Sequence, residues 1–236
     1  MPRYDALLID ADDTLFDFGA AEAASLEETC AQCGVPWLDS TLGGYRVINE
    51  EMWRRYERKE IGHMELNAQR FARFFEMCGV EGDSAAFGRA YIKRLGMAGR
   101  LLPGALEFIR NVSQVMPVAI VTNGFGPVQR GRLEVSPLAA LVRGIVISEE
   151  QGTAKPDPRM IRAGMELAGV TDVSRVIMVG DSLENDVGAA KAAGAAACWL
   201  NPGQLKARDG LLPDYEIDTL EQLYGILQLD NNALNA

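Results

Sequence analysis

The sequence predicts an α/β protein, with a doubly wound parallel sheet as its core and an all-helical insertion after the first strand. Short apolar runs alternate with helical patterns through the second half of the chain. These runs are continuously apolar, which is typical of strands covered on both faces of a parallel sheet. Residues 18–98 contain no β-branched run and carry successive helical patterns punctuated by glycines instead.

Five strands are expected, and helices should connect most of them. The first strand is Leu7–Ile9, which lies ahead of the insertion. The remaining predicted strands are Val118–Val121, Gly144–Ile147, Val176–Val179 and Ala196–Leu200. Helical patterns lie near residues 104–115, 125–135, 157–168 and 184–193. We therefore expect a core made of residues 1–17 and 99–236, and a helical cap made of residues 18–98.

The composition limits the classes of partner. The chain has 236 residues, and 33 acidic against 23 basic side chains give a net charge of −10. This balance argues against binding to a nucleic-acid polymer or to an anionic membrane surface, because both need a basic stripe. The apolar runs are too short to span a bilayer, and the first residues carry no signal-peptide pattern. Four cysteines without a scaffold pattern favour a cytoplasmic protein.

Polar side chains gather where the predicted strands end, and ligands of open α/β sheets bind at that edge. Asp10 and Asp12 follow the first strand, and Asp181 follows a later one. The other candidates at this edge are Thr122, Asn123, Lys155 and Asp186. Any one such residue is often a turn former or a helix cap, but their convergence at several strand ends points to a site. Asp13, by contrast, is expected to be a local turn or capping residue.

The residue inventory excludes several mechanisms. The single histidine, His63, lies in the helical insertion, which argues against a Ser-His-Asp triad and against a two-histidine phosphatase. The chain also lacks the G-x-x-x-x-G-K-[ST] and G-x-G-x-x-G patterns that cradle nucleotide phosphates. What remains for catalysis is a set of carboxylates and one lysine.

Carboxylates and a lysine are suited to phosphoryl transfer. Residues i and i+2 of an extended chain share a face, so Asp10 and Asp12 can approach one substrate, one attacking phosphorus and the other protonating the leaving oxygen. A phosphate facing carboxylates needs a hard divalent cation, and Mg²⁺ fits that requirement. Asp181 offers a second carboxylate ligand to that cation. The remaining candidates would orient a water (Asp186), bind the phosphoryl oxygens (Thr122 and Asn123) and balance their charge (Lys155).

Four motifs in order resemble the haloacid dehalogenase superfamily of Mg²⁺-dependent phosphohydrolases. They are "LLIDADDTLF", "VAIVTNGF", "GTAKPDP" and "VIMVGDSLENDV". The resemblance covers essentially the whole chain and implies a Rossmann-like core with an inserted cap of the C1 type. It implies that Asp10 is the nucleophile that forms an aspartyl phosphate and that Asp12 is the general acid and base. The metal ligands implied are Asp10, Asp12 through its backbone carbonyl, Asp181 and Asp186, and the phosphate-binding residues are Thr122, Asn123 and Lys155.

Within the superfamily, "DADDTLF", "TNGF" followed by Gln129 and Arg132, and "CWLN" are most similar to the bacterial pyrimidine 5′-nucleotidases. The substrate implied is a small phosphomonoester, namely a nucleoside 5′-monophosphate. A phosphoglycolate or sugar-phosphate phosphatase would share the same mechanism, and a mutase would share the same motifs. A dehalogenase needs no metal, so Asp12 and Asp181 count against it. A phosphorylation-switch receiver domain is a non-enzymatic alternative, but such domains lack a long insertion after the first strand.

The sequence leaves the contribution of the cap open. Lys59, Gly62 and His63 are candidates for substrate contact near a predicted cap turn. Trp53 and its aromatic neighbours at helical spacing are expected to form mainly the core of the cap. The oligomeric state cannot be derived from any of these patterns.

Overall fold

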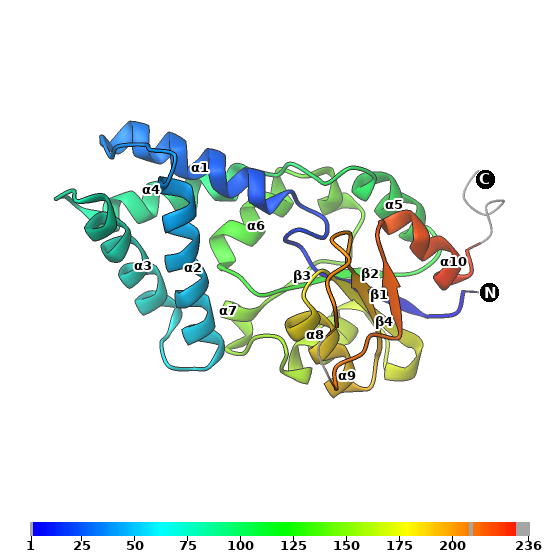
Figure 1. The fold of residues 1–236 in the computed structure, drawn as a ribbon. Coiled ribbons are helices and arrows are strands. Elements are labelled where there is room, and N and C mark those ends of the chain that lie inside the picture. Colours follow the sequence, from blue (N-terminus) through cyan, green and yellow to red (C-terminus); the bar gives the residue numbers. More distant parts are fainter. Residues whose placement is uncertain (1, 208–209, 230–236) are drawn as a thin grey trace.

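Six parallel strands form one sheet in the order β3-β2-β1-β4-β5-β6 (Figure 1). This computed structural model describes residues 2–207 and 210–229. The strands are β1 (Ala6–Ile9), β2 (Val118–Thr122), β3 (Ile145–Ile147), β4 (Val176–Gly180), β5 (Ala196–Leu200) and β6 (Tyr215–Ile217). The strand order reverses direction at β1, which pairs with β2 on one side and with β4 on the other. That reversal is the point where open α/β sheets bind their ligands.

Helices cover both faces of the sheet, which explains the continuous apolar runs of the strands. Leu7 and Ile9 of β1 belong to a cluster with two of the core helices, α5 (Ala105–Val112) and α10 (Leu223–Leu227), whereas Leu8 belongs to the opposite cluster with α8 (Pro158–Ala168) and α9 (Gly188–Ala193). The helices of the core are α5 (Ala105–Val112), α6 (Gly126–Glu134), α7 (Ser148–Gln151), α8 (Pro158–Ala168), α9 (Gly188–Ala193) and α10 (Leu223–Leu227). The short turns between them are η1 (Pro137–Ala140), η2 (Val173–Arg175), η3 (Leu183–Val187) and η4 (Leu220–Gln222).

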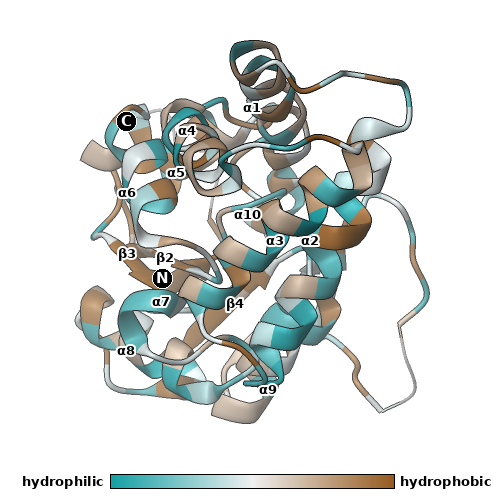
Figure 2. Ribbon diagram, turned by 90° about the vertical axis from the view of Figure 1, so that its left-hand side faces the viewer, coloured by the Kyte–Doolittle hydropathy of each residue, from teal (hydrophilic) through white to brown (hydrophobic). Residues whose placement is uncertain are grey.

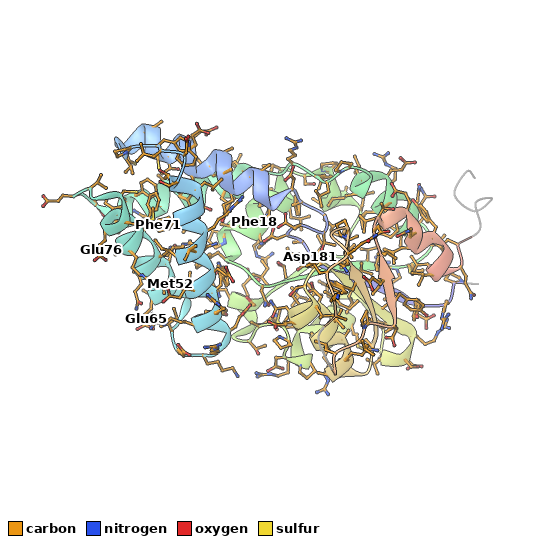
Figure 3. All side chains as sticks on the ribbon, viewed as in Figure 1. Phe18, Met52, Glu65, Phe71, Glu76 and Asp181 are labelled. Atoms are coloured by element: carbon orange, nitrogen blue, oxygen red, sulfur yellow. The ribbon has the colours of Figure 1, made fainter. Side chains whose placement is uncertain are left out.

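Five helices lie between β1 and β2 in the chain, and we call the first four of them the cap. These four are α1 (Phe18–Cys33), α2 (Thr41–Glu57), α3 (His63–Cys78) and α4 (Ser84–Met97). Their apolar faces share a third cluster that is rich in aromatic rings. Figure 3 shows two of its members, Met52 on α2 and Phe71 on α3, within the cap. Phe125 and Val128 of the core belong to the same cluster, so the cap packs onto the start of α6.

The two segments that connect core and cap run side by side. Phe16 forms an antiparallel bridge with Leu101, and the Asp17 amide donates to the Arg100 carbonyl at 3.1 Å. The Leu102 amide in turn donates to the Leu15 carbonyl at 2.9 Å. The ends of the cap are therefore held together at one place on the core.

Helices α4 and α6 make a close backbone contact between cap and core. A Cβ atom added at Gly131 of α6 would lie 2.7 Å from the carbonyl oxygen of Gly96 in α4. Such a distance is shorter than real Cβ contacts, so the two helices can approach this closely only because Gly131 has no side chain. Figure 1 shows α6 between the cap helices and the sheet.

The five predicted strands are confirmed to within one residue at every end, whereas two other features differ from the prediction. Strand β6 was not predicted, because Tyr215 and Glu216 are partly exposed at the sheet edge and make no apolar run. The helix expected over 184–193 is divided, with η3 forming a π-helical turn ahead of α9. The helical stretch near 125–135 corresponds to α6.

The strands are more uniformly apolar than the helices. In Figure 2 the strands β2, β3 and β4 are mainly hydrophobic, whereas the helices mix hydrophobic and hydrophilic residues. Within residues 2–207 and 210–229, no helix combines the length and the apolar character that crossing a membrane requires.

Candidate active site

Three carboxylates converge where β1 and β4 end. Asp10 directly follows β1, Asp181 directly follows β4, and Asp186 lies one turn later in η3. One oxygen from each of these side chains lies within 4.8 Å of the others. Asp10 and Asp186 are buried, whereas Asp181 is exposed. The sequence predicted this convergence, since parallel strands deliver their carboxyl ends to one edge.

Lys155 lies at the centre of this cluster with only 2% of its side chain exposed. Its Nζ donates to Asp10 Oδ1 at 2.5 Å, to Asp186 Oδ1 at 2.6 Å and to the Val121 carbonyl at 2.8 Å. Burial alone would lower the pKa of Lys155, but the two carboxylates outweigh this effect and raise the pKa. The ammonium group therefore stays charged and offsets part of the negative charge of the cluster.

Asn123 holds the Lys155 loop against the end of β2. Its side-chain Nδ2 donates to the Lys155 carbonyl at 2.9 Å, and its Oδ1 accepts from the Lys155 amide at 2.8 Å. Both polar ends of the Asn123 amide are thus engaged with the backbone of Lys155. Thr122, the last residue of β2, is buried beside this connection. Phosphate binding by Thr122 and Asn123 stays a prediction.

Asp186 occupies a place that only a glycine neighbour permits. Its Oδ2 accepts from the Ser182 amide at 3.0 Å, at the start of the π-helical turn. A Cβ atom added at Gly180 would lie 2.1 Å from the same oxygen. The glycine at the end of β4 therefore gives the Asp186 carboxylate room beside Lys155.

Asp181 is fixed through its backbone rather than through its carboxylate. The Trp199 indole N–H donates to the Asp181 carbonyl at 2.7 Å. The Thr14 hydroxyl donates to Asp181 Oδ1 over a longer distance of 3.5 Å. Figure 3 shows Asp181 on the core. Although Asp181 is exposed, the surrounding atoms of the site shield its carboxylate from part of the solvent, and this desolvation together with the charge of Asp186 raises the pKa of Asp181 to about 7.

Asp10 also has a pKa well above its usual range, because burial disfavours its charge and the carboxylates of Asp186 and Asp181 add to that effect. Lys155 opposes the shift. Three carboxylates against one ammonium leave an excess of negative charge in a small space. Clustered carboxylate oxygens are the donor set that Mg²⁺ prefers, so these residues fit a divalent cation. Asp10, Asp181 and Asp186 would hold it.

The Asp12 side chain lies outside this carboxylate cluster and faces α6 instead. Gln129 Nε2 donates to Asp12 Oδ2 at 2.8 Å, and the Arg132 guanidinium pairs with Asp12 Oδ1. About a quarter of the Asp12 side chain is exposed. Sequence reasoning gave these two partners no chemical role, although their i, i+3 spacing on a helix places both on one face.

Asp13 is confirmed as a turn and capping residue. Its φ of 54° lies in the left-handed region, and its Oδ1 accepts from the amides of Phe18 (3.1 Å) and Gly19 (3.2 Å) at the start of α1. A carboxylate at this helix N-terminus also complements the helix dipole. Of the three neighbouring aspartates, Asp13 thus supports the chain entry into the cap.

A cavity of about 180 Å³ lies between Asp12 and the cap. Core residues Gly124 and Gln129 form part of its wall. Its aromatic lining is Phe18, Trp53, Tyr91 and Phe125, and its polar cap residues are Asn49 and Arg70. Lys59 and Gly62 line a different cavity, together with Gly152 and Thr153. Trp53 therefore lines the cavity of the candidate site as well as packing in the aromatic cluster of the cap.

A family model for the haloacid dehalogenase-like hydrolases matches residues 4–194, which is most of the chain. The chain belongs to the haloacid dehalogenase-like hydrolases. This membership confirms the resemblance carried by the four motifs, and with it the α/β, Rossmann-like fold class.

Full-length relatives of this hydrolase family are about one-third identical to the chain. The HAD-hydrolase YfnB of Bacillus subtilis is 33% identical over 99% of both chains. Two pyrimidine 5′-nucleotidases are each 32% identical: YjjG of Escherichia coli, over 95% of this chain and 98% of its own, and PynA of Streptococcus pneumoniae, over 98% and 97%. The crystal structure of YfnB, bound to magnesium, superposes with a TM-score of 0.89 over 96% of this chain and all of its own.

Proposed function

We propose that this hydrolase is a Mg²⁺-dependent phosphomonoesterase that forms an aspartyl phosphate on Asp10 and acts on pyrimidine nucleoside 5′-monophosphates. The observation that carries the proposal is the arrangement at the end of β1: Asp10 lies against Lys155, and Asp12 borders a small aromatic cavity. The nucleotidase relatives and the magnesium-bound YfnB structure support it.

In the first step a carboxylate oxygen of Asp10 attacks phosphorus. The bond from phosphorus to the ester oxygen breaks, and Asp12 gives its proton to that leaving oxygen. In the second step water attacks phosphorus and Asp12 takes the water proton. The acyl phosphate bond breaks, which releases inorganic phosphate and restores the Asp10 carboxylate.

Lys155 and the end of β2 would hold the phosphoryl group during both steps. Lys155 supplies a fixed positive charge beside Asp10, and Thr122 is buried at the neighbouring strand end. When bound by Asp10, Asp181 and Asp186, Mg²⁺ supplies further charge stabilisation for the phosphoryl oxygens. The backbone carbonyl of Asp12 is proposed as a fourth ligand.

The size and lining of the cavity favour a single flat ring as the base of the leaving nucleoside. Its volume of about 180 Å³ is close to the ~150 Å³ apolar cavity that admits benzene. Trp53 and Phe125 present aromatic surfaces 5.6 Å apart between ring centres, and such surfaces pack well against a planar base. A pyrimidine meets these limits better than a two-ring purine.

Arg70 gives a second candidate substrate a specific basis. Its guanidinium is buried beside the same cavity, and its hydrogen bonds go to the neutral amides of Asn49 (2.8 Å) and Asn67 (2.9 Å). A buried cation with neutral partners suits an anionic group, so a carboxylated ester such as phosphoglycolate is the alternative.

Phosphate release from a panel of esters tests the proposal. We expect the purified protein with Mg²⁺ to prefer uridine, deoxyuridine and cytidine monophosphates over adenosine monophosphate, phosphoglycolate and glucose 6-phosphate in kcat/KM. Chelation with EDTA should silence it, and Asp10→Asn should reduce kcat by at least about 10³-fold. A preference for phosphoglycolate would favour the alternative, and full activity of Asp10→Asn would overturn the mechanism.

A further inference from the structure

We propose that Arg132, acting with Gln129, is the positioning residue that sets the orientation of Asp12 for proton transfer to the leaving group. This inference rests on the proposed function, which gives Asp12 that proton transfer. Neither side chain reaches the carboxylate cluster around Lys155. Both act on the reaction through Asp12.

The two donors hold the two oxygens of Asp12 separately. Arg132 Nη1 donates to Oδ1, and Gln129 Nε2 donates to Oδ2 at 2.8 Å. Two donors on different oxygens fix both the position and the plane of a carboxyl group. Each oxygen keeps a second lone pair, so the group can still carry and transfer a proton.

Arg132 is itself buried and held by several contacts. Its side chain is fully buried, and its Nε donates to the Ala98 carbonyl at 3.3 Å. Its guanidinium lies over the rings of Phe16, at 4.5 Å from the ring centre, and of Phe18, at 5.7 Å. Ala98 and Phe18 flank the two segments that join core and cap. Arg132 therefore lies between Asp12 and both connections to the cap.

The electrostatics make this pairing obligatory in the folded protein. The Arg132 guanidinium is fully buried, and the carboxyl group of Asp12 is its acidic partner. Asp12 is in turn about a quarter exposed, on the side of the cavity. One edge of the carboxyl group is thus anchored while the other can meet a ligand.

Glycines make room for this arrangement. A Cβ atom added at Gly124 would lie 2.8 Å from Gln129 Nε2, so the Gln129 amide reaches Asp12 over a residue without a side chain. The Gly124 amide donates to the Ser148 hydroxyl at 3.1 Å, which fixes that crossing point. Gly131, next to Arg132, allows α4 to pack against α6 (Figure 1).

A misplaced general acid slows the hydrolysis of some esters more than that of others, and the ratio of their kcat/KM values is the readout of the test. Alkoxide leaving groups need a proton as the ester bond breaks, whereas activated phenolates leave without one. General acid catalysis contributes about 10²–10⁴-fold for the former. The comparison uses kcat/KM, because this constant reports only the steps up to departure of the leaving group.

Arg132→Lys is the principal variant, since it keeps the charge and loses the fork of donors. We expect its kcat/KM for uridine monophosphate to fall at least about 10-fold, and that for p-nitrophenyl phosphate to fall less than about 3-fold. Across a series of substituted phenyl phosphates, kcat/KM of Arg132→Lys should fall more steeply with rising pKa of the leaving phenol than kcat/KM of the wild type does. Gln129→Met, which removes the second donor at similar volume, should change the same ratio in the same direction.

Arg130→Lys is the matched control, because Arg130 lies on the same helix, is exposed and pairs with Glu150. Its ratio of the two kcat/KM values should equal that of the wild type. In an Asp12→Asn background, Arg132→Lys should cause no further loss with uridine monophosphate. Circular dichroism and thermal melting establish that each variant is folded.

The outcomes separate this inference from the proposed function. Equal losses on both esters in Arg132→Lys, or the same loss in the Asp12→Asn background, would show a merely structural role and overturn it. Should Arg132→Lys fail to fold, Gln129→Met decides by the same ratio. If the wild type hydrolyses neither ester, or if Asp12→Asn equals the wild type, the proposed function itself fails.

Discussion

At the scale of single residues, Lys155 stabilises the carboxylate cluster, because its ammonium group pairs with both Asp10 and Asp186. We expect Lys155→Met to lower the free energy of unfolding by about 3–5 kcal/mol, because it leaves Asp10 and Asp186 buried without their cation. Urea denaturation at neutral pH in EDTA measures the change. Lys191→Met is the control, since Lys191 forms an exposed pair with Asp214 and should cost less than about 1 kcal/mol. Similar losses in the two variants would contradict the central role of Lys155.

His63 provides a pH-dependent signal that needs no assignment, because it is the only histidine. The centre of its ring lies 4.1 Å from the centre of the Tyr56 ring and 4.8 Å from that of Phe125. Neither ring nitrogen has a hydrogen-bond partner among the described residues. Burial lowers the pKa of His63, and the positive charge of Arg70 lowers it further. The negative charge of Glu149 opposes this shift but does not cancel it.

A histidine with a lowered pKa stabilises the fold above its unfolded pKa of about 6.5, and this stability is lost as the pH falls from there through the folded pKa. Proton NMR titration of the His63 ring should therefore give a pKa below 6.5 in the folded protein and an ordinary value in urea. Equal values in the two states would show that the ring is not buried as described.

The residues that the sequence identified are those with a local signal. Asp10 and Asp181 directly follow apolar runs, and Lys155 lies between prolines and glycines. Arg132 could not be found in this way, since its partner Asp12 is 120 positions away and its own surroundings look like an ordinary helix. Its role follows only from the packing of α6 against the end of β1.

At the scale of elements, the backbones of α4 and α6 form a close contact between cap and core at Gly96 and Gly131. Gly131→Ala should lower stability by about 1–3 kcal/mol, because the added methyl group would press on the Gly96 carbonyl. Chemical denaturation measures this against Gly225→Ala in α10, where a Cβ atom meets nothing within 4 Å. The control should be neutral or slightly stabilising, as alanine favours helix. A neutral Gly131→Ala would mean that α4 and α6 separate readily.

The observed element boundaries agree with those predicted from the sequence where every residue of a strand is buried, and they differ where only some residues are buried. Strands β1 and β4 are buried throughout and were predicted almost residue by residue. Strand β6 has only Ile217 buried, so its pattern does not stand out. The π-helical turn of η3 was also missed, because it follows from the position of Asp186 against Gly180 rather than from helix propensity.

At the scale of the whole molecule, metal binding should be linked to stability. A cation held by Asp10, Asp181 and Asp186 in the folded state alone stabilises by about 2.7 kcal/mol at a hundredfold excess over its Kd. We expect Mg²⁺ to raise the melting temperature relative to NaCl of equal ionic strength. Asp181→Asn should reduce that rise, while Asp39→Asn, at an exposed position in the cap, should preserve it. An unchanged rise in Asp181→Asn would argue against Asp181 as a ligand.

The bridge between Phe16 and Leu101 has a consequence for how such a protein can change over evolutionary time. Residues 18–98 leave and re-enter the core at neighbouring positions, so exchanging this segment for a shorter or longer one alters loop-closure entropy only slowly with length. The pairing of β1 with β2 joins Leu7–Ile9 to Val118–Ile120 and involves no residue of the segment between them. The junction is therefore a natural point for grafting: the cap can be replaced as one module, while the side chains at the sheet edge keep their positions.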